Sequence, residues 1–226
     1  MSTLLDLRTR VSELMSDTGF TTNSSSFVDQ SINDAQREIA EQVKLLFKKT
    51  TSSSVDGTQS YSLPTDFMCM YTDSKNVVYT DTNDDDTYLN WYTYDLARNS
   101  YDDLNDTSVT GTPKFFWLQN KSIYYYKTPD YSGSSNISIE HYYYPATLSG
   151  DASIADLPDK YKMAIVYLAC AKISDRNELF DQGGMFRLRY YLPELNRIDN
   201  TTDESLSSKR SVGSEYLGDG SVGVIG

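Results

Sequence analysis

Few residues of this chain could do chemistry, and they are scattered. His141 is the single histidine, and no nucleophile-elbow pattern stands near its strand-like run IEHYYYP. Cys69 and Cys170 lie far apart in different kinds of segment, so one histidine and two such cysteines give no zinc-ligand spacing. We interpret His141 as a strand residue with a satisfied side chain, and the cysteines as buried thiols without a disulfide.

An acidic stretch matches the opening of a calcium-binding loop. Asp81, Asn83 and Asp85 fit its first, third and fifth positions, but Asp86 replaces the sixth-position glycine and Tyr92 the twelfth-position glutamate. These departures favour a solvated acidic turn. Weak, nonspecific cation binding there stays open.

The segment Gly218–Gly223 matches the G-x-G-x-x-G pattern of dinucleotide-binding loops. That pattern requires a strand before it and a helix after it, and only three residues follow Gly223. We therefore predict no nucleotide site here.

Adjacent carboxylates occur in three polar, loop-like segments. Glycoside hydrolysis needs one carboxyl of a pair held in an apolar pocket, which such segments do not provide. Spacing in the sequence does not reveal proximity in space, so a hydrolase remains an alternative. Otherwise we predict no enzyme, no cofactor and no metal site. The three segments are Asp84-Asp85-Asp86, Asp102-Asp103 and Asp203-Glu204.

The composition indicates a protein that works through its surfaces. The 226 residues carry a formal net charge of −12, which argues against gripping nucleic acid by its phosphates but not against DNA sliding past. The 19 tyrosines offer large contact areas with a polar end, as half-buried strands and protein interfaces do. The amphipathic start is no signal peptide, and no apolar run reaches membrane-spanning length, so we expect a soluble protein made in a cytoplasm.

Helical spacing of apolar residues occurs at both ends of the chain. It predicts one helix over residues 4–15 and a second from the serines before Phe27 to about Lys49. Pro158 fits the first position of a third helix, which runs to about Phe180. The pair Gly183-Gly184 separates it from a fourth helix over residues 185–198, where Pro193 introduces a bend.

The middle of the chain has strand signals instead. From Tyr61 to Pro145, short runs rich in aromatic and β-branched residues alternate with polar joints. The run LQNKSIYYY predicts a hairpin with Asn120-Lys121 at its turn.

These elements predict an α+β fold in which N- and C-terminal helices form one bundle around a β-rich insertion. The expected domains are a discontinuous helical bundle of residues 1–50 and 156–200, a β-rich inserted domain of residues 51–155, and an extended C-terminal tail of residues 201–226.

Two segments then resemble a known family. The strand end Tyr61-Ser62-Leu63-Pro64 precedes the insertion, and Leu157-Pro158 opens a helix with Tyr161, Tyr167 and Ala169 that returns the chain to the bundle. This layout resembles the head-to-tail adaptor, or connector, proteins of tailed bacteriophages.

The resemblance implies a structural virion protein. Such adaptors form a ring, usually twelve-fold, beneath the portal protein at the head–tail interface, and are assembled in the host cytoplasm. The ring extends the channel through which double-stranded DNA passes, without specific binding, during packaging and ejection. Its other partners are tail components of the nozzle, stopper or tail-tube kind. The resemblance does not identify the tail partner or the partner of the insertion.

The glycine-rich end GSEYLGDGSVGVIG has little to bury by itself. We expect it to become ordered against portal or a neighbouring subunit, where its apolar side chains would be buried and its glycines would allow close approach. Two alternatives stay open: an adaptor that also degrades cell wall, and a tyrosine-rich carbohydrate-binding module. The predicted partner-binding residues are Tyr216, Leu217, Val222, Val224 and Ile225.

Overall fold

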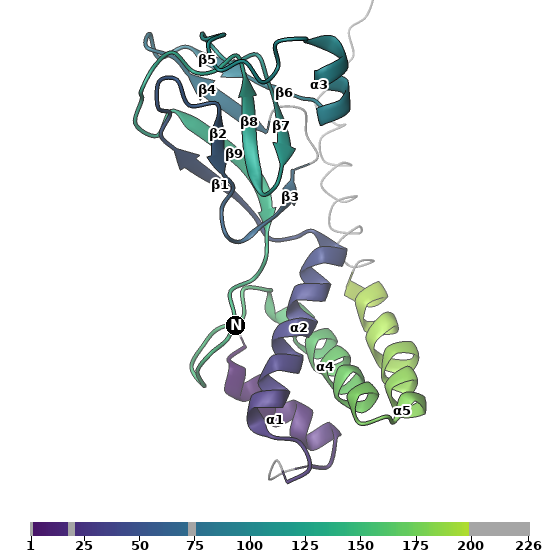
Figure 1. Ribbon diagram of the computed structural model, residues 1–226. Helices are drawn as coiled ribbons and strands as arrows, with labels where there is room; N and C mark the ends of the chain where they lie inside the picture. The colour runs from purple at the N-terminus through teal and green to yellow at the C-terminus, as the bar shows by residue number, and fades with distance from the viewer. Residues whose placement is uncertain (1, 18–20, 72–75, 199–226) are drawn as a thin grey trace, which may run out of the picture. The chain divides into compact units, whose positions relative to one another are not determined.

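The computed structural model describes residues 2–17, 21–71 and 76–198. The chain forms two compact units, each packed mainly within itself. The first, called here the helical unit, contains Met1–Ile39 and Thr147–Gly226, and the second, the β-rich unit, contains Ala40–Ala146. The fold is thus mixed α+β, with helices and two sheets (Figure 1).

The two N-terminal helices begin at polar caps. Helix α1 (Leu4–Leu14) has a capping box, in which the Thr3 hydroxyl accepts from the Asp6 amide and the Asp6 carboxylate accepts from the Thr3 amide. Helix α2 (Ser25–Val43) follows Ser24, whose hydroxyl accepts from the amide of Phe27. The predicted serine cap of the second helix is therefore confirmed.

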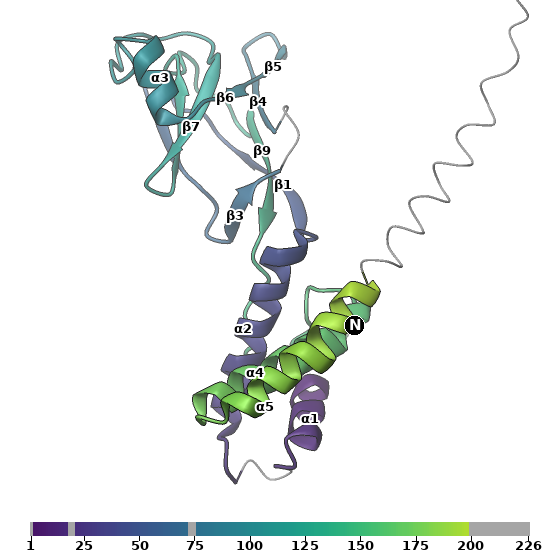
Figure 2. The same ribbon diagram turned by 90° about the vertical axis from the view of Figure 1, so that its right-hand side faces the viewer.

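The C-terminal half of the helical unit is centred on α4 (Lys162–Arg176), which a 3-10 turn, η1 (Asp159–Tyr161), precedes. Then come α5 (Phe180–Met185), a π-helical segment η2 (Phe186–Tyr191) and a last helical stretch over residues 192–198. Helix α4 contacts α1, α5 and η2, and α4 and α5 lie side by side in both views (Figures 1 and 2). Pro193 has no amide hydrogen to donate to the preceding turn, and the wider π-helical turns directly before it accommodate that loss.

The second helix ends earlier than its apolar spacing predicts. Lys44 adopts a left-handed conformation with a φ of 48° and donates its amide to the Ala40 carbonyl, which ends α2. The next residues form strand β1 (Phe47–Ser52) and pair with β9. The prediction of helix to Lys49 was wrong because long-range strand pairing overrides the local periodicity.

The two adjacent glycines do not separate the last helices. Gly183 and Gly184 lie inside α5, and the break comes earlier, at Glu178, which has a φ of 61°. Gly183 lies against Asp175 and the Ala171 carbonyl of α4, so a β-carbon there would overlap α4. Glycine at this position serves close helix packing, which the sequence pattern does not distinguish from a helix break.

The β-rich unit contains two sheets. In the first, the order is β1-β9-β4-β5, with β3 (Phe67–Met70) also pairing with β9 (Ile137–Tyr143). Its remaining strands are β4 (Val77–Thr80) and β5 (Asp86–Tyr88). The second sheet has the order β2-β8-β7-β6, formed by β2 (Ser60–Ser62), β8 (Ser122–Tyr126), β7 (Phe115–Gln119) and β6 (Asn90–Trp91).

The central strands β7 and β8 of the second sheet bury side chains on both faces, which explains their aromatic composition. Phe116, Ile123 and Tyr125 point into a core shared with the first sheet. Phe115 and Trp117, on the alternate positions of β7, point to a second core with Ala97 of the short helix α3 (Tyr94–Ser100). Figure 2 shows α3 beside β7. Strands with two buried faces lack the usual polar alternation.

The predicted hairpin is confirmed, whereas α3 was not predicted. Asn120 and Lys121 link β7 to β8 with φ values of 50° and 61°, as a tight turn with two left-handed residues requires. Helix α3 lies inside the tyrosine-rich stretch interpreted as a strand, and Thr93 caps it by accepting from the Leu96 amide. That threonine cap was the available sequence signal.

Candidate functional site

Most of the predicted chemistry-bearing residues lie in separate elements, but Cys69 of β3 pairs with Tyr142, the residue next to His141 in β9. His141 lies in β9, fully buried and stacked on the Phe67 ring with 5.4 Å between ring centroids. Its Nδ1 atom is 3.4 Å from the Ile139 carbonyl, and its Nε2 atom has no hydrogen-bond partner among the described residues. The strand position agrees with the prediction, but the expected satisfied side chain was wrong. Burial lowers the pKa of His141.

The acidic stretch is the turn between β4 and β5. The Asp81 carboxylate accepts from the amides of Asn83 and Asp85, at 2.8 and 3.1 Å, so it organises the turn itself. Within residues 2–17, 21–71 and 76–198, no three His, Cys, Asp or Glu side chains come together as metal ligands would.

Among the described residues, the remaining candidates are the carboxylate of Asp103 and the two cysteines, and each has a structural role. Asp103 accepts from the Tyr126 hydroxyl at 3.1 Å. Both cysteines are free thiols, with Cys170 buried in α4 and Cys69 half-buried in β3. Burial raises the pKa of the Cys170 thiol to about 12, which keeps it protonated and unreactive at neutral pH.

The five predicted partner-binding residues, Tyr216, Leu217, Val222, Val224 and Ile225, lie outside the described residues, as do the segments Gly218–Gly223 and Asp203-Glu204. The structure does show another candidate binding site, which the sequence did not indicate. It is a cavity of about 690 Å³ within the β-rich unit.

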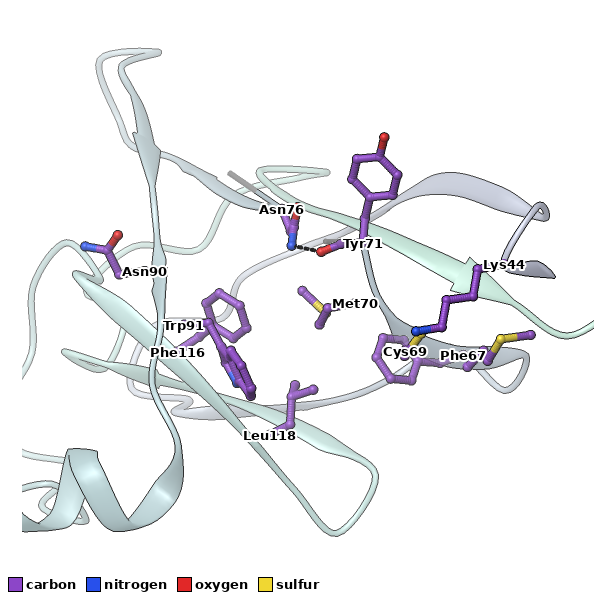
Figure 3. A pocket seen from close by; sticks show the side chains of 11 residues that line it. Lys44, Phe67, Cys69, Met70, Tyr71, Asn76, Asn90, Trp91, Phe116 and Leu118 are labelled. Carbon is purple, nitrogen blue, oxygen red and sulfur yellow. Dashed lines mark hydrogen bonds between the residues drawn. The ribbon is translucent and has the colours of Figure 1, made fainter. Parts of the chain in front are cut away.

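The cavity opens between the two sheets, beside β3 of the first sheet and β6 of the second. Among the described strands, β3 pairs with β9 and β6 pairs with β7, so no strand pairs with both. Phe67, Met68 and Met70 form the wall on the side of β3. Figure 3 shows Met70 between Phe67 on this side and Trp91, Phe116 and Leu118 on the opposite side. Met70 and Leu118 also pack on the core shared by the sheets, so the floor of the cavity continues into that core.

Trp91 is the most exposed of the large apolar residues that line the cavity. Its side chain is 62% exposed, although it is held on a strand that pairs in parallel with β7. The other tryptophan of the chain, Trp117, is fully buried on the opposite face of the same sheet. A large aromatic surface at an apolar hollow is typical of sites that bind another chain or a ligand.

The polar groups at the cavity are few. Lys44 lines one side and is the single charged residue among the lining residues that the structure describes. Asn76 donates its Nδ2 hydrogen to the Tyr71 carbonyl (Figure 3), while its buried Oδ1 atom has no partner within the described part of the chain. Such a site suits an apolar guest with a polar or acidic edge.

The helical unit exposes apolar side chains on its last helices. Leu188 of η2 is 69% exposed and Phe180 of α5 is 67% exposed. Leu179 and Leu192 are also exposed. Side chains of this kind on consecutive helical segments are candidates for contacts with another protein.

The cavity and the exposed apolar side chains of the helical unit are therefore the candidate binding surfaces of the described residues. Residues 2–212 of the sequence match the family described as SU10 adaptor protein. The chain therefore belongs to the SU10 adaptor protein family, which confirms the resemblance to phage head-to-tail adaptors. Comparison of the sequence with curated proteins yields no match. Among the described residues, no helix is long and apolar enough to span a membrane.

Proposed function

We propose that the protein is a head-to-tail adaptor that forms a ring, of about twelve copies, beneath the portal of a tailed phage. The observation that carries this function is the family match over residues 2–212, which spans all of the β-rich unit and most of the helical unit. The ring extends the DNA channel and offers a docking surface to tail components. It acts as a structural part of the virion, without catalysis.

The helical unit supplies the contacts between subunits in this account. The contact of α1 with α4 joins the N-terminal and C-terminal parts of the chain, as a discontinuous bundle requires. The exposed Phe180, Leu188 and Leu192 would then be buried between copies of the ring, which would remove apolar surface from water.

The acidic composition suits a channel for DNA. With a net charge of −12, a channel wall that is acidic or neutral on balance would not hold phosphates during packaging or ejection. Lysines and arginines would lie in rings or at subunit contacts. A continuous basic lining in the assembled ring would contradict this part of the proposal.

The C-terminal residues anchor the ring. Residues 201–226 would be buried against portal or a neighbouring subunit through Tyr216, Leu217, Val222, Val224 and Ile225. Fixing the backbone costs about 1–2 kcal/mol per residue, and burying a large apolar side chain contributes about 1.5–3 kcal/mol. One copy therefore gains little from this anchor, and many copies on a ring would gain avidity.

A truncation tests the anchor and the function together. A chain that ends after Glu204 should keep its thermal unfolding nearly unchanged but fail to co-sediment with portal. The full chain should co-sediment as a ring, with its mass measured by native mass spectrometry. A full chain that neither forms rings nor binds portal would contradict the proposed function.

The alternatives from the sequence give different outcomes. Clearing of a peptidoglycan zymogram would identify an adaptor that also degrades cell wall. Binding to glycans by a monomer that ignores portal would identify a carbohydrate-binding module instead.

A further inference from the structure

We propose that the cavity of the β-rich unit binds the C-terminal segment, residues 213–226, of a neighbouring copy of the chain. The neighbour is supplied by the ring proposed above, on which this inference rests. It goes further by naming a receptor surface, lined by Phe67, Met70, Trp91 and Leu118, for a segment whose binding place nothing else identifies.

The chemistry of the guest matches that of the cavity. The chain beyond the described residues is 28 residues long, from 199 to 226, and holds seven apolar side chains by the count of Leu, Val, Ile and Tyr. Five of the seven fall between Tyr216 and Ile225. An apolar cavity gains from such a cluster, because both surfaces leave water together.

The order of residues suits an added strand. Val222 and Val224 stand two apart, so in an extended chain their side chains point to the same face. Gly223 between them lets the backbone approach closely. Among the described residues, β3 pairs with β9 on one side and β6 with β7 on one side, so each has a free edge beside the cavity. If the C-terminal segment paired with either edge as an added strand, it would gain backbone hydrogen bonds, and the side chains of both valines would point into the cavity.

The length and the charge of the C-terminal segment also agree with binding to the cavity of a neighbouring copy. An extended segment of 28 residues spans up to about 90 Å at about 3.3 Å per residue, which is enough to leave one copy and enter the next. Glu215 and Asp219 flank the leucine and tyrosine, and Lys44 is the charged residue described at the cavity. The carboxylates beside Tyr216 and Leu217 would thus lie near a side chain of opposite charge.

The two tryptophans make the cavity measurable. Trp91 is 62% exposed on the cavity wall, and Trp117 is fully buried elsewhere. Filling the cavity would remove water from Trp91 and shift its fluorescence emission to shorter wavelength, while Trp117 stays as it is.

The test uses a synthetic peptide of residues 213–226 and the full chain carrying Val222→Asp and Val224→Asp, which removes competition from its own C-terminal residues. We expect the peptide to bind, by calorimetry, and to shift the Trp91 emission. A peptide with both valines replaced by serine should bind at least about tenfold more weakly.

Matched variants of the receptor chain test whether the peptide binds in the cavity. Trp91→Asp should abolish peptide binding by calorimetry, and Trp91→Phe should retain it. Leu96→Asp is the control, because Leu96 is similarly exposed, at 52%, but lies on α3 outside the cavity. Circular dichroism confirms that each variant is folded.

Three results would overturn the inference: no binding of the peptide at millimolar concentration, binding that Trp91→Asp leaves unchanged, or a wild-type chain whose Trp91 is already shielded when diluted to a monomer. The last would assign the segment to the cavity of its own chain. None of these experiments contains portal, so a failure here leaves portal attachment, and with it the proposed function, separately testable.

Discussion

Gly183 of α5 lies directly against Asp175 of α4, and the Asp175 carboxylate also pairs with Arg187 of η2 at 2.5 Å. A β-carbon at Gly183 would overlap the carboxylate and crowd the Ala171 carbonyl, which is 3.2 Å from the place of that atom. Asp175 of α4 thus contacts both α5 and η2, and its contact with α5 requires a residue without a side chain at position 183.

Gly183→Ala should destabilise the helical unit, since small-to-large changes in packed sites cost about 1–3 kcal/mol. Gly184→Ala is the matched control, because nothing lies within 4 Å of its β-carbon and alanine gains about 1 kcal/mol in a helix. Urea unfolding of both variants measures the difference. Equal stabilities would mean that α4 and α5 do not pack closely at Gly183.

Arg8 should contribute far more to stability than Arg10, two residues away. Arg8 binds Asp29 of α2 through two hydrogen bonds of 2.8 Å and reaches Asp151 at the same distance. Among the residues that the structure describes, Arg10 pairs with Glu13 of its own helix alone, in an exposed site. Arg8→Met should cost about 1–3 kcal/mol, and Arg10→Met less than about 0.5 kcal/mol. Similar losses in chemical denaturation would contradict the bridging role of Arg8.

Acid should weaken the helical unit through Asp17. The carboxylate of Asp17 accepts from the amides of Thr21, Thr22 and Asn23, and the bond from Asn23 contributes most to lowering its pKa from 3.8 to about 2. The folded state binds the proton less readily than the unfolded state, so the stabilisation is present above pH 4 and is lost as the pH falls toward 2.

Asp17→Asn should therefore be less stable than the wild type at pH 7, and the difference should shrink below about pH 4. Thermal unfolding at several pH values measures this. A difference that does not change with pH would show that the carboxylate charge is not what stabilises the turn.

His141 predicts a separate pH dependence in the β-rich unit. Burial lowers its pKa below the ordinary value of 6.5, so the unfolded state takes up a proton first and stability should fall as the pH drops below about 6.5. Because this is the single histidine, His141→Phe should flatten the slope of stability between pH 7 and pH 5. An unchanged slope in the variant would assign it to carboxylates instead.

Local patterns predicted the elements that depend on neighbouring residues. The Ser24 cap and the turn at Asn120-Lys121 are of this kind. Contacts with other elements decided the failures: pairing with β9 makes Phe47–Ser52 a strand, and packing on the preceding helix α4 gives Gly183 its role. No local rule detects either one.

The candidate site was beyond sequence reasoning for the same reason. Met70, Trp91 and Leu118 come from three separate segments of the sequence. They line one cavity because the strands that carry them belong to two sheets that lie on either side of it. Their types did indicate burial, but an exposed tryptophan and a buried one look alike in the sequence. The family, by contrast, was recognisable from two short segments and the order of elements.

The most direct test of the adaptor function is negative-stain electron microscopy of the full chain mixed with purified portal. We expect rings of about twelve copies that lie coaxially on portal, with a continuous central channel. A preparation in which portal rings stay bare while the chain remains monomeric, at concentrations where both are folded, would contradict it.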